Sequence, residues 1–301
     1  MQRSSQGSKR IWRTGFIDHD GAILRYAVNL SDQKTVDRFV VFFNGRTEWI
    51  EKYSHLCTSL DLPQSCGFLT WDHRGQGGSS GVRGHIDDYG QFARDARAII
   101  THVVKNIPYV AISHSMGGLI LLSGVLSKQI NPKGLILCSP LLKLPNQPVP
   151  RWLLYPLSLI ASSTGFRYAS CGGGGIERVL PEGNPLTHSL EVFDQEQHPP
   201  YPVPTPTFGW LLATARASEE VFELDRLKNL EVPILMLGGT EESVVDFSSF
   251  SAWTIKVKTI TRVSVDLALI SGARHELLAE SPEYYEQAVR ILKKQLRAWS
   301  M

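Results

Sequence analysis

The sequence predicts an α/β fold with a mainly parallel central sheet, and two observations carry this prediction. From residue 11 onward, short runs rich in β-branched and aromatic residues alternate with segments of helical periodicity, as expected when helices connect parallel strands. Most of these runs are continuously apolar, as strands covered on both faces must be. The candidate strands are residues 39–43, 68–71, 109–112, 134–138, 233–237 and 265–270.

The segments around these strands fit the same architecture. Apolar residues within 92–103 and 285–296 fall on one helical face, so both segments are predicted to be helices flanking the sheet. Residues 11–17 and 23–28 lie on either side of Asp20-Gly21, a turn signal. They predict an antiparallel hairpin at the edge of the sheet.

The alternation breaks between residues 141 and 217. This stretch holds most of the chain's 17 prolines and a run of four glycines, a composition that suits short helices and loops. We therefore predict a core in two parts, residues 1–140 and 218–301. Residues 141–217 are predicted to form an inserted lid over the strand ends, called the cap below.

Composition excludes several classes of protein. With 43% hydrophobic and 20% charged residues and a net charge of +2, the chain lacks the basic excess of a nucleic-acid binder, and no such partner is expected. No apolar signal segment precedes Ile11, and the longest apolar stretch, 152–161, is shorter than the roughly 20 residues that span a bilayer. The four cysteines form no CxxC pair. We expect a cytoplasmic protein, and the sequence indicates no oligomeric state.

The sharpest local signal is AISHSMGG at residues 111–118, between a predicted strand and a predicted helix. This context is typical of a nucleophile elbow, a tight turn that exposes a serine. The turn needs small residues two positions on either side. Gly117 meets this need, and Ser113 stands where glycine is usual. We predict Ser115 as the nucleophile, with an ordinary glycine-containing helix start as the alternative.

Residues 44–48 (NGRTE) follow the first central strand. In hydrolases with such an elbow, one oxyanion-hole N–H comes from this loop and the other from the residue after the nucleophile. The backbone amides of Arg46 and Met116 are therefore the candidates, and a plain strand-ending turn is the alternative. For the Arg46 guanidinium we expect a solvated surface position rather than contact with a substrate anion.

Chain order directs the search for the base and the acid, because hydrolases with this elbow place them in the order Ser, acid, His. Among nine histidines, only His275 combines this order with a position just past a strand. A surface histidine is the alternative. Glu241, Glu242 and Asp246 follow the preceding strand, and either residue type can hold the imidazole tautomer. Spacing does not choose among them, although Asp246 is well placed to cap the next helix.

Four motifs stand out together: NGRTE with Glu51-Lys52-Tyr53, WDHRGQG at 71–77, the Ser115 elbow and GARHEL at 272–277. Together they resemble the α/β-hydrolases of the monoglyceride lipase and bacterial lysophospholipase type, with the lysophospholipase branch closest. The similarity runs nearly end to end. It implies an α/β-hydrolase fold with Ser115 as nucleophile, His275 as base and Glu242 as acid, at a position where the family often has aspartate. Asp72, His73 and Arg74 are expected to order loops through hydrogen bonds.

The sequence therefore predicts a serine carboxylic-ester hydrolase that cleaves a single-chain lipid, a lysophospholipid or a monoacylglycerol, through an acyl-enzyme. No metal or organic cofactor is required. Trp152, Leu153 and Tyr155 in the cap are predicted to contact the acyl chain, although a buried cap helix would explain them equally well. The same apolar segment is suited to reversible contact with a membrane surface.

Two other functions fit parts of the sequence. An aminopeptidase of the same fold would need acidic cap residues to hold a free amine, and the candidates are Glu177, Glu182, Glu191 and Asp194. A non-catalytic binding module that kept the fold would explain the unusual Ser113 and Glu242.

Overall fold

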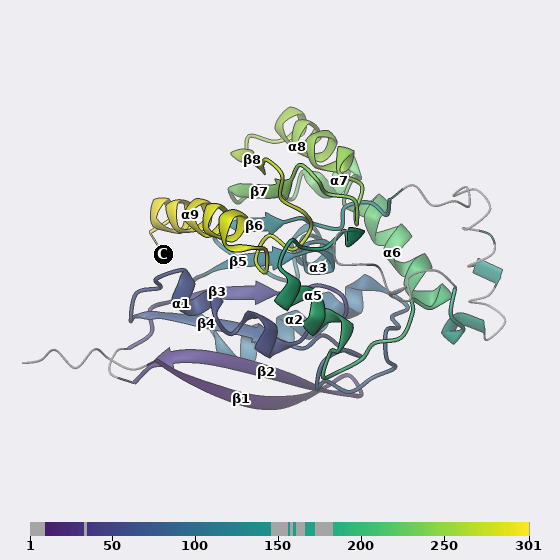
Figure 1. The fold of residues 1–301 in the computed structure, drawn as a ribbon, viewed down its shortest axis with the longest axis horizontal. Helices are drawn as coiled ribbons and strands as arrows, with labels where there is room; N and C mark the ends of the chain where they lie inside the picture. Colours follow the sequence, from purple (N-terminus) through teal and green to yellow (C-terminus); the bar gives the residue numbers. More distant parts are fainter. Residues whose placement is uncertain are drawn as a thin grey trace, which may run out of the picture.

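An eight-stranded sheet forms the centre of the molecule (Figure 1). The computed structural model describes residues 10–32, 35–145, 156, 159–160, 166–171 and 183–300. The strands are β1 (Arg10–His19), β2 (Ala22–Ser31), β3 (Arg38–Phe43), β4 (Cys66–Trp71), β5 (Tyr109–His114), β6 (Leu135–Cys138), β7 (Ile234–Gly239) and β8 (Val265–Ile270). Their order is β1-β2-β4-β3-β5-β6-β7-β8. Only the pairings of β2 are antiparallel, so the predicted α/β class with a mainly parallel sheet is confirmed.

The first two strands form the predicted hairpin at the sheet edge. They pair from Arg10 with Ser31 to His19 with Ala22. Asp20 and Gly21 form the turn with φ angles of 48° and 73°. A two-residue turn with both φ angles positive matches the twist of the strands that it joins. The hairpin prediction is confirmed, and both strands are longer than expected.

Each face of the sheet carries its own hydrophobic core. In β3, residues 39, 41 and 43 belong to one core, whereas residues 40 and 42 belong to the other, because successive side chains of a strand point to opposite faces. The helices of the first face are α2 (Tyr89–Val103), α3 (Met116–Leu126) and α8 (Ser248–Ile260); those of the second are α1 (Leu56–Ser59) and α9 (Pro282–Ala298). Cover on both faces explains the apolar runs of the central strands.

The chain between β6 and β7 leaves the sheet and returns to the neighbouring position. The two strands pair in parallel from Leu135 with Ile234 to Cys138 with Leu237. Between them the structure describes η2 (Phe166–Tyr168), α5 (Leu190–Gln197), α6 (Phe208–Glu220) and α7 (Leu224–Leu227). Helix α6 adds Trp210 and Ala213 to the first core, so the end of the cap is anchored to the sheet.

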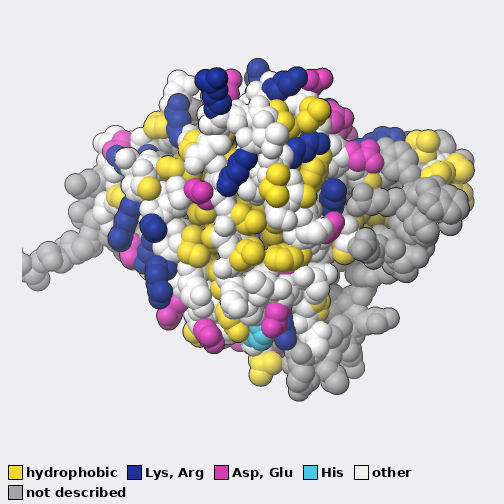
Figure 2. Space-filling view, turned by 90° about the horizontal axis from the view of Figure 1, so that it is seen from above, with side chains coloured by type: hydrophobic (Ala, Val, Ile, Leu, Met, Phe, Trp, Pro, Cys, Tyr) yellow, Lys and Arg dark blue, Asp and Glu magenta, His cyan; other side chains and the backbone are white. Residues whose placement is uncertain are grey.

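Strand β8 ends the sheet on the side opposite the hairpin, and the surface there is partly apolar. Ile255 of α8 and Leu269 of β8 are exposed. Hydrophobic side chains gather between lysines and arginines on this face (Figure 2). The outer strand is therefore less covered than the central ones.

The parallel strands place their carboxyl ends at one edge of the sheet. The loops after β3, β5, β7 and β8 begin there and carry residues 44–48, Ser115, Glu242 and His275. Ligand sites of open α/β sheets lie outside the carboxyl ends of the strands. The topology thus brings the predicted site residues to one region.

Candidate active site

Ser115 occupies a strained turn between β5 and α3. Its backbone has φ 50° and ψ −120°, a conformation that L side chains rarely adopt and that must be held by its surroundings. The Ser115 N–H donates to the Cys138 carbonyl at 3.0 Å, and the Ser115 carbonyl accepts from the Leu141 N–H at 2.9 Å. Within residues 109–126 every residue is buried except Ser115. The sequence thus folds into an elbow that leaves this serine accessible.

The small residues around Ser115 have the close contacts that an elbow requires. A Cβ on Gly117 would clash with the carbonyl oxygens of Phe43 and Asn44, so α3 approaches the end of β3 only because residue 117 is glycine. Ser113 is fully buried, and its Oγ donates to the Ile136 carbonyl at 3.3 Å. The departure from glycine at position 113 is therefore accommodated by a hydrogen bond.

The loop after β3 is held against this elbow by its own hydrogen bonds. The Gly45 N–H donates to the carboxylate of Glu48, and the Thr47 N–H donates to Gln76 Oε1 at 2.6 Å. The N–H of Arg46 lies between these two and bonds to no group in the described part of the chain. Together with the Met116 N–H at the start of α3, it stays the candidate for an oxyanion hole.

The imidazole of His275 pairs with one of the three candidate acids. Its Nδ1 lies 2.7 Å from Glu242 Oε2, and both side chains are buried. Glu242 Oε1 accepts hydrogen bonds from the backbone N–H groups of Val244 and Val245, at 2.7 and 3.1 Å. Burial alone would raise the pKa of Glu242, but His275 and the two N–H groups outweigh burial and lower the pKa.

The other two carboxylates point elsewhere. Glu241 is about half exposed, and its carboxylate lies 3.7 Å from both His188 and Arg274. Asp246 accepts from the Ser248 N–H at 3.0 Å, at the start of α8, as the capping prediction requires. The choice that spacing left open is thus made by the loop after β7, which directs only Glu242 toward His275.

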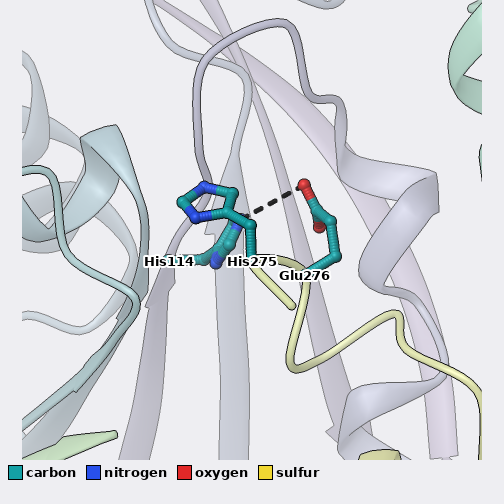
Figure 3. A group of neighbouring side chains, drawn as sticks. All are labelled: His114, His275 and Glu276. Carbon is teal, nitrogen blue, oxygen red and sulfur yellow. Dashed lines mark ion pairs between the residues drawn. The ribbon is translucent and has the colours of Figure 1, made fainter. Parts of the chain in front are cut away.

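A buried charge cluster lies behind this pair, and sequence reasoning missed it. Lys52 Nζ lies 2.8 Å from Glu48, 3.0 Å from Glu276 and 2.5 Å from Glu196 of α5. Glu276 also pairs with His114 Nε2 at 3.3 Å (Figure 3). The cluster joins the loop after β3, the elbow, the histidine loop and a cap helix.

Charges within the cluster stabilise one another. Burial opposes the charge of Lys52, but the three carboxylates outweigh it and raise the Lys52 pKa well above its ordinary value. Burial likewise opposes the charge of Glu276, but Lys52 and His114 lower its pKa. Glu276 and Glu48 in turn raise the pKa of His114 against the effect of burial. The sequence could have indicated an ion pair between Glu48 and Lys52, which are four residues apart. It contains no pattern that predicts the contact of Glu196 with Lys52.

Three side chains of this region could in principle ligate a metal ion. His114, His275 and Glu276 each offer one ligand atom, and these atoms lie within 4.8 Å of one another. Glu276 is already bound by Lys52 and His114, and His275 Nδ1 by Glu242. A divalent cation would have to compete with the Lys52 ammonium, so the group is better described as an ion-paired cluster.

The guanidinium of Arg46 does not lie free at the surface, so that expectation is wrong. Its Nη2 donates to the Pro204 carbonyl at 2.7 Å, and its Cζ lies 5.1 Å from the centroid of the Trp210 ring. Burial lowers the pKa of Arg46 to about 10. Packing of the cap on the loop after β3 is what encloses this side chain.

The DHR motif after β4 makes the contacts expected of loop-ordering groups. Asp72 accepts from the backbone N–H groups of Ile50 and Gly78, at 2.9 and 2.7 Å. His73 Nε2 donates to the Asn44 carbonyl at 3.0 Å, and burial lowers the pKa of His73 to about 4. Arg74 pairs with Asp95 of α2 at 2.7 Å.

The predicted acyl-chain contacts Trp152, Leu153 and Tyr155 lie outside the described residues. The described residues of the cap expose several large hydrophobic side chains, namely Leu159, Ile160, Phe166, Tyr168 and Leu190. In the described part of the chain, none of the helices is both long and apolar enough to cross a bilayer.

The fold and the elbow define the class of the protein, an α/β hydrolase. A family model described as serine aminopeptidase S33 (Hydrolase_4) matches residues 34–282. The chain belongs to this family.

Individual relatives confirm the resemblance seen in the motifs. A probable lysophospholipase L2 of Haemophilus influenzae is 26% identical over 269 residues, covering 85% of this chain and 83% of that protein. A monoglyceride lipase homolog of Monkeypox virus is 24% identical over 295 residues, covering 94% and 95%. The structure of a soluble variant of monoglyceride lipase from Saccharomyces cerevisiae superposes with a TM-score of 0.74 at 18% identity, covering 95% of this chain and 94% of that one. At this identity the structural likeness shows the fold.

Proposed function

We propose that this protein is a serine carboxylic-ester hydrolase that cleaves a single-chain lipid, a lysophospholipid or a monoacylglycerol. One observation carries the proposal: a strained, accessible Ser115 and a buried His275–Glu242 pair lie on loops at the same edge of the sheet. The names of two relatives, a probable lysophospholipase and a monoglyceride lipase homolog, support the substrate class.

In the proposed mechanism, Ser115 Oγ attacks the ester carbonyl while His275 Nε2 accepts its proton. Glu242 holds the other ring nitrogen, which fixes the tautomer and stabilises the imidazolium. The N–H groups of Arg46 and Met116 bind the oxyanion. His275 then protonates the departing alcohol and activates the water that releases the fatty acid from the acyl-enzyme.

The cap supplies the selectivity in this proposal. An apolar cap can enclose one acyl chain, whereas a second or third chain would need its own path out of the same opening. Exposed Phe166 and Leu190 suit reversible contact with a membrane surface, where such lipids reside. A cytoplasmic location stays a prediction from the sequence.

An aminopeptidase is the second candidate, and the description of the family favours it. Two of its four candidate amine-binding acids, Glu177 and Glu182, lie outside the described residues, and Glu191 and Asp194 are exposed on α5. The buried acid of α5, Glu196, is bound to Lys52. Within the described part of the cap, the enclosed carboxylate is therefore one that already pairs with a lysine.

The geometry removes both arguments for a non-catalytic binding module. Ser113 was one reason to consider it, and its hydroxyl is hydrogen-bonded inside the sheet. Glu242 was the other reason, because the family often has aspartate there. The Glu242 carboxylate nevertheless reaches His275. Both departures from the family pattern are compatible with catalysis.

A panel of substrates tests the proposal. We expect kcat/KM for a lysophospholipid or a monoacylglycerol to exceed that for a diacyl phospholipid and a triacylglycerol of equal chain length by about tenfold or more. Aminoacyl amides are the comparison for the peptidase. A preference for the diacyl or triacyl lipid, or for the amides, would contradict the proposed substrate class.

A further inference from the structure

The Arg46 side chain is a half-buried cation that the proposed mechanism does not use. In the described part of the chain it forms no ion pair, and its one hydrogen bond goes to the Pro204 carbonyl. Its Nε is buried without a hydrogen-bond partner. The Trp210 ring covers one side of the guanidinium. Within the described residues, Arg46 therefore has unused donors and no carboxylate paired with its charge.

Such an arrangement is unfavourable unless something else compensates it. An unpaired buried charge loses its hydration and gains no ion pair in return. A pKa of about 10 means that Arg46 keeps its charge at neutral pH. In surroundings of low dielectric constant, an anion that reaches this charge is bound more strongly than at an exposed arginine.

The position of Arg46 in the chain connects this charge to the proposed oxyanion hole. Its own N–H is the predicted oxyanion donor, so the guanidinium lies within one side-chain length of that N–H. Gly84 flanks it on the other side, where an added Cβ would lie 3.4 Å from Arg46 Nη2 and 3.3 Å from the Pro204 oxygen. The loop around residue 84 and the cap segment 203–210 thus pack against the guanidinium.

We propose that Arg46 binds the phosphate of a lysophospholipid head group and so selects lysophospholipids over monoacylglycerols. This inference rests on the function proposed above. In a lysophospholipid the phosphate is carried by the same glycerol as the reacting ester, which holds the anion close to the carbonyl. The guanidinium donates paired hydrogen bonds that match phosphate oxygens. A monoacylglycerol presents an uncharged hydroxyl at the same place.

The test compares two esters with the same acyl chain, palmitoyl lysophosphatidylglycerol and monopalmitoylglycerol. The measured quantity is the ratio of their kcat/KM values in the wild type, Arg46→Met and Arg46→Lys. We expect Arg46→Met to lower the ratio by about 10- to 100-fold, the size of a lost hydrogen bond to a charged group. Arg46→Lys restores part of the ratio because it restores the charge. An unchanged ratio in Arg46→Met would overturn the proposal.

Arg83 provides the matched control. Its guanidinium donates to the carbonyls of Tyr201 and Pro202, at 3.0 and 3.1 Å, so it holds the same cap segment as Arg46. If Arg46 served only to hold the cap, Arg83→Met would lower the ratio equally, and that result would also overturn the proposal. We expect Arg83→Met to keep the wild-type ratio.

Two further outcomes distinguish this proposal from binding of free phosphate and from a failure of the proposed function. If inorganic phosphate inhibits hydrolysis of both esters alike and Arg46→Met abolishes the inhibition without changing the ratio, the site binds free phosphate and the head-group proposal is wrong. If the wild type hydrolyses neither ester, the proposed function itself fails. We expect measurable hydrolysis of both esters and weak inhibition by inorganic phosphate.

Discussion

Two cations in the same stretch of chain, the buried Lys52 and the half-buried Arg46, have opposite surroundings. Lys52 lies within hydrogen-bonding distance of three carboxylates, from Glu48, Glu196 and Glu276. Arg46, six residues earlier, has a carbonyl and an indole ring but no carboxylate in the described part of the chain. The charge of Lys52 is compensated inside the protein. Under the proposal above, the phosphate of a substrate compensates the charge of Arg46.

The compensated cation holds the loops of the candidate site together. Through its three partners Lys52 connects the loop after β3, the loop that carries His275 and helix α5 of the cap. His114, next to Ser115, joins through Glu276. Buried ion pairs add little net stability but are costly to break. The comparison therefore predicts that removing either cation has very different consequences.

Lys52→Met should have the largest effect on stability. The substitution leaves three buried carboxylates without their cation, and we expect the free energy of unfolding to fall by about 3–5 kcal/mol. Arg46→Met is the matched variant, and it should cost less than about 1 kcal/mol because it removes a half-buried charge that has no ion pair among the described residues. Urea unfolding of both variants measures the difference. Equal losses would show that the two cations do not differ as described.

Glu196→Gln should have a smaller effect that depends on pH. Burial raises the pKa of Glu196 to about 7, and the nearby carboxylates of Glu276 and Glu48 add to this increase, whereas Lys52 opposes it. Between the ordinary pKa of 4.5 and about 7, the folded protein binds more protons at this group than the unfolded chain does. The stability associated with Glu196 is therefore complete below pH 4.5 and is lost as the pH rises toward and through 7.

The measurement is urea unfolding of the wild type and Glu196→Gln at pH 5 and pH 8. We expect the wild type to lose on the order of 1–3 kcal/mol relative to Glu196→Gln over this interval. Glu191→Gln, which changes an exposed glutamate of the same helix, should follow the wild type. A wild type that loses no stability relative to Glu196→Gln as the pH rises would mean that Glu196 is ionised throughout, which would contradict this prediction.

The two regions also show what the sequence could and could not predict. Apolar runs located the strands, with β8 predicted at residues 265–270 as observed, because central strands are covered on both faces. The elbow was visible because its small residues are neighbours in the chain. The surroundings of Arg46 and Lys52 could not be predicted. Pro204 lies 158 residues from Arg46, and Glu196 lies 144 residues from Lys52. Charged residues are expected at the surface unless tertiary packing encloses them.

The choice of acid shows the same limit on a smaller scale. Glu241, Glu242 and Asp246 lie within one loop, and any of them satisfies the order Ser, acid, His. The hydrogen bonds from Val244 and Val245 to Glu242 turn this one carboxylate inward. Such a local conformation follows from the path of the backbone, which residue spacing does not encode.

Labelling by a fluorophosphonate probe tests the central claim most directly, because the probe reacts only with an activated serine. We predict stoichiometric labelling of the wild type at Ser115, no labelling of Ser115→Ala, and normal labelling of Ser113→Ala, whose lost hydroxyl bonds only within the sheet. An unlabelled wild type, or a Ser115→Ala variant that is labelled at the wild-type rate, would contradict the assignment of Ser115 as the nucleophile.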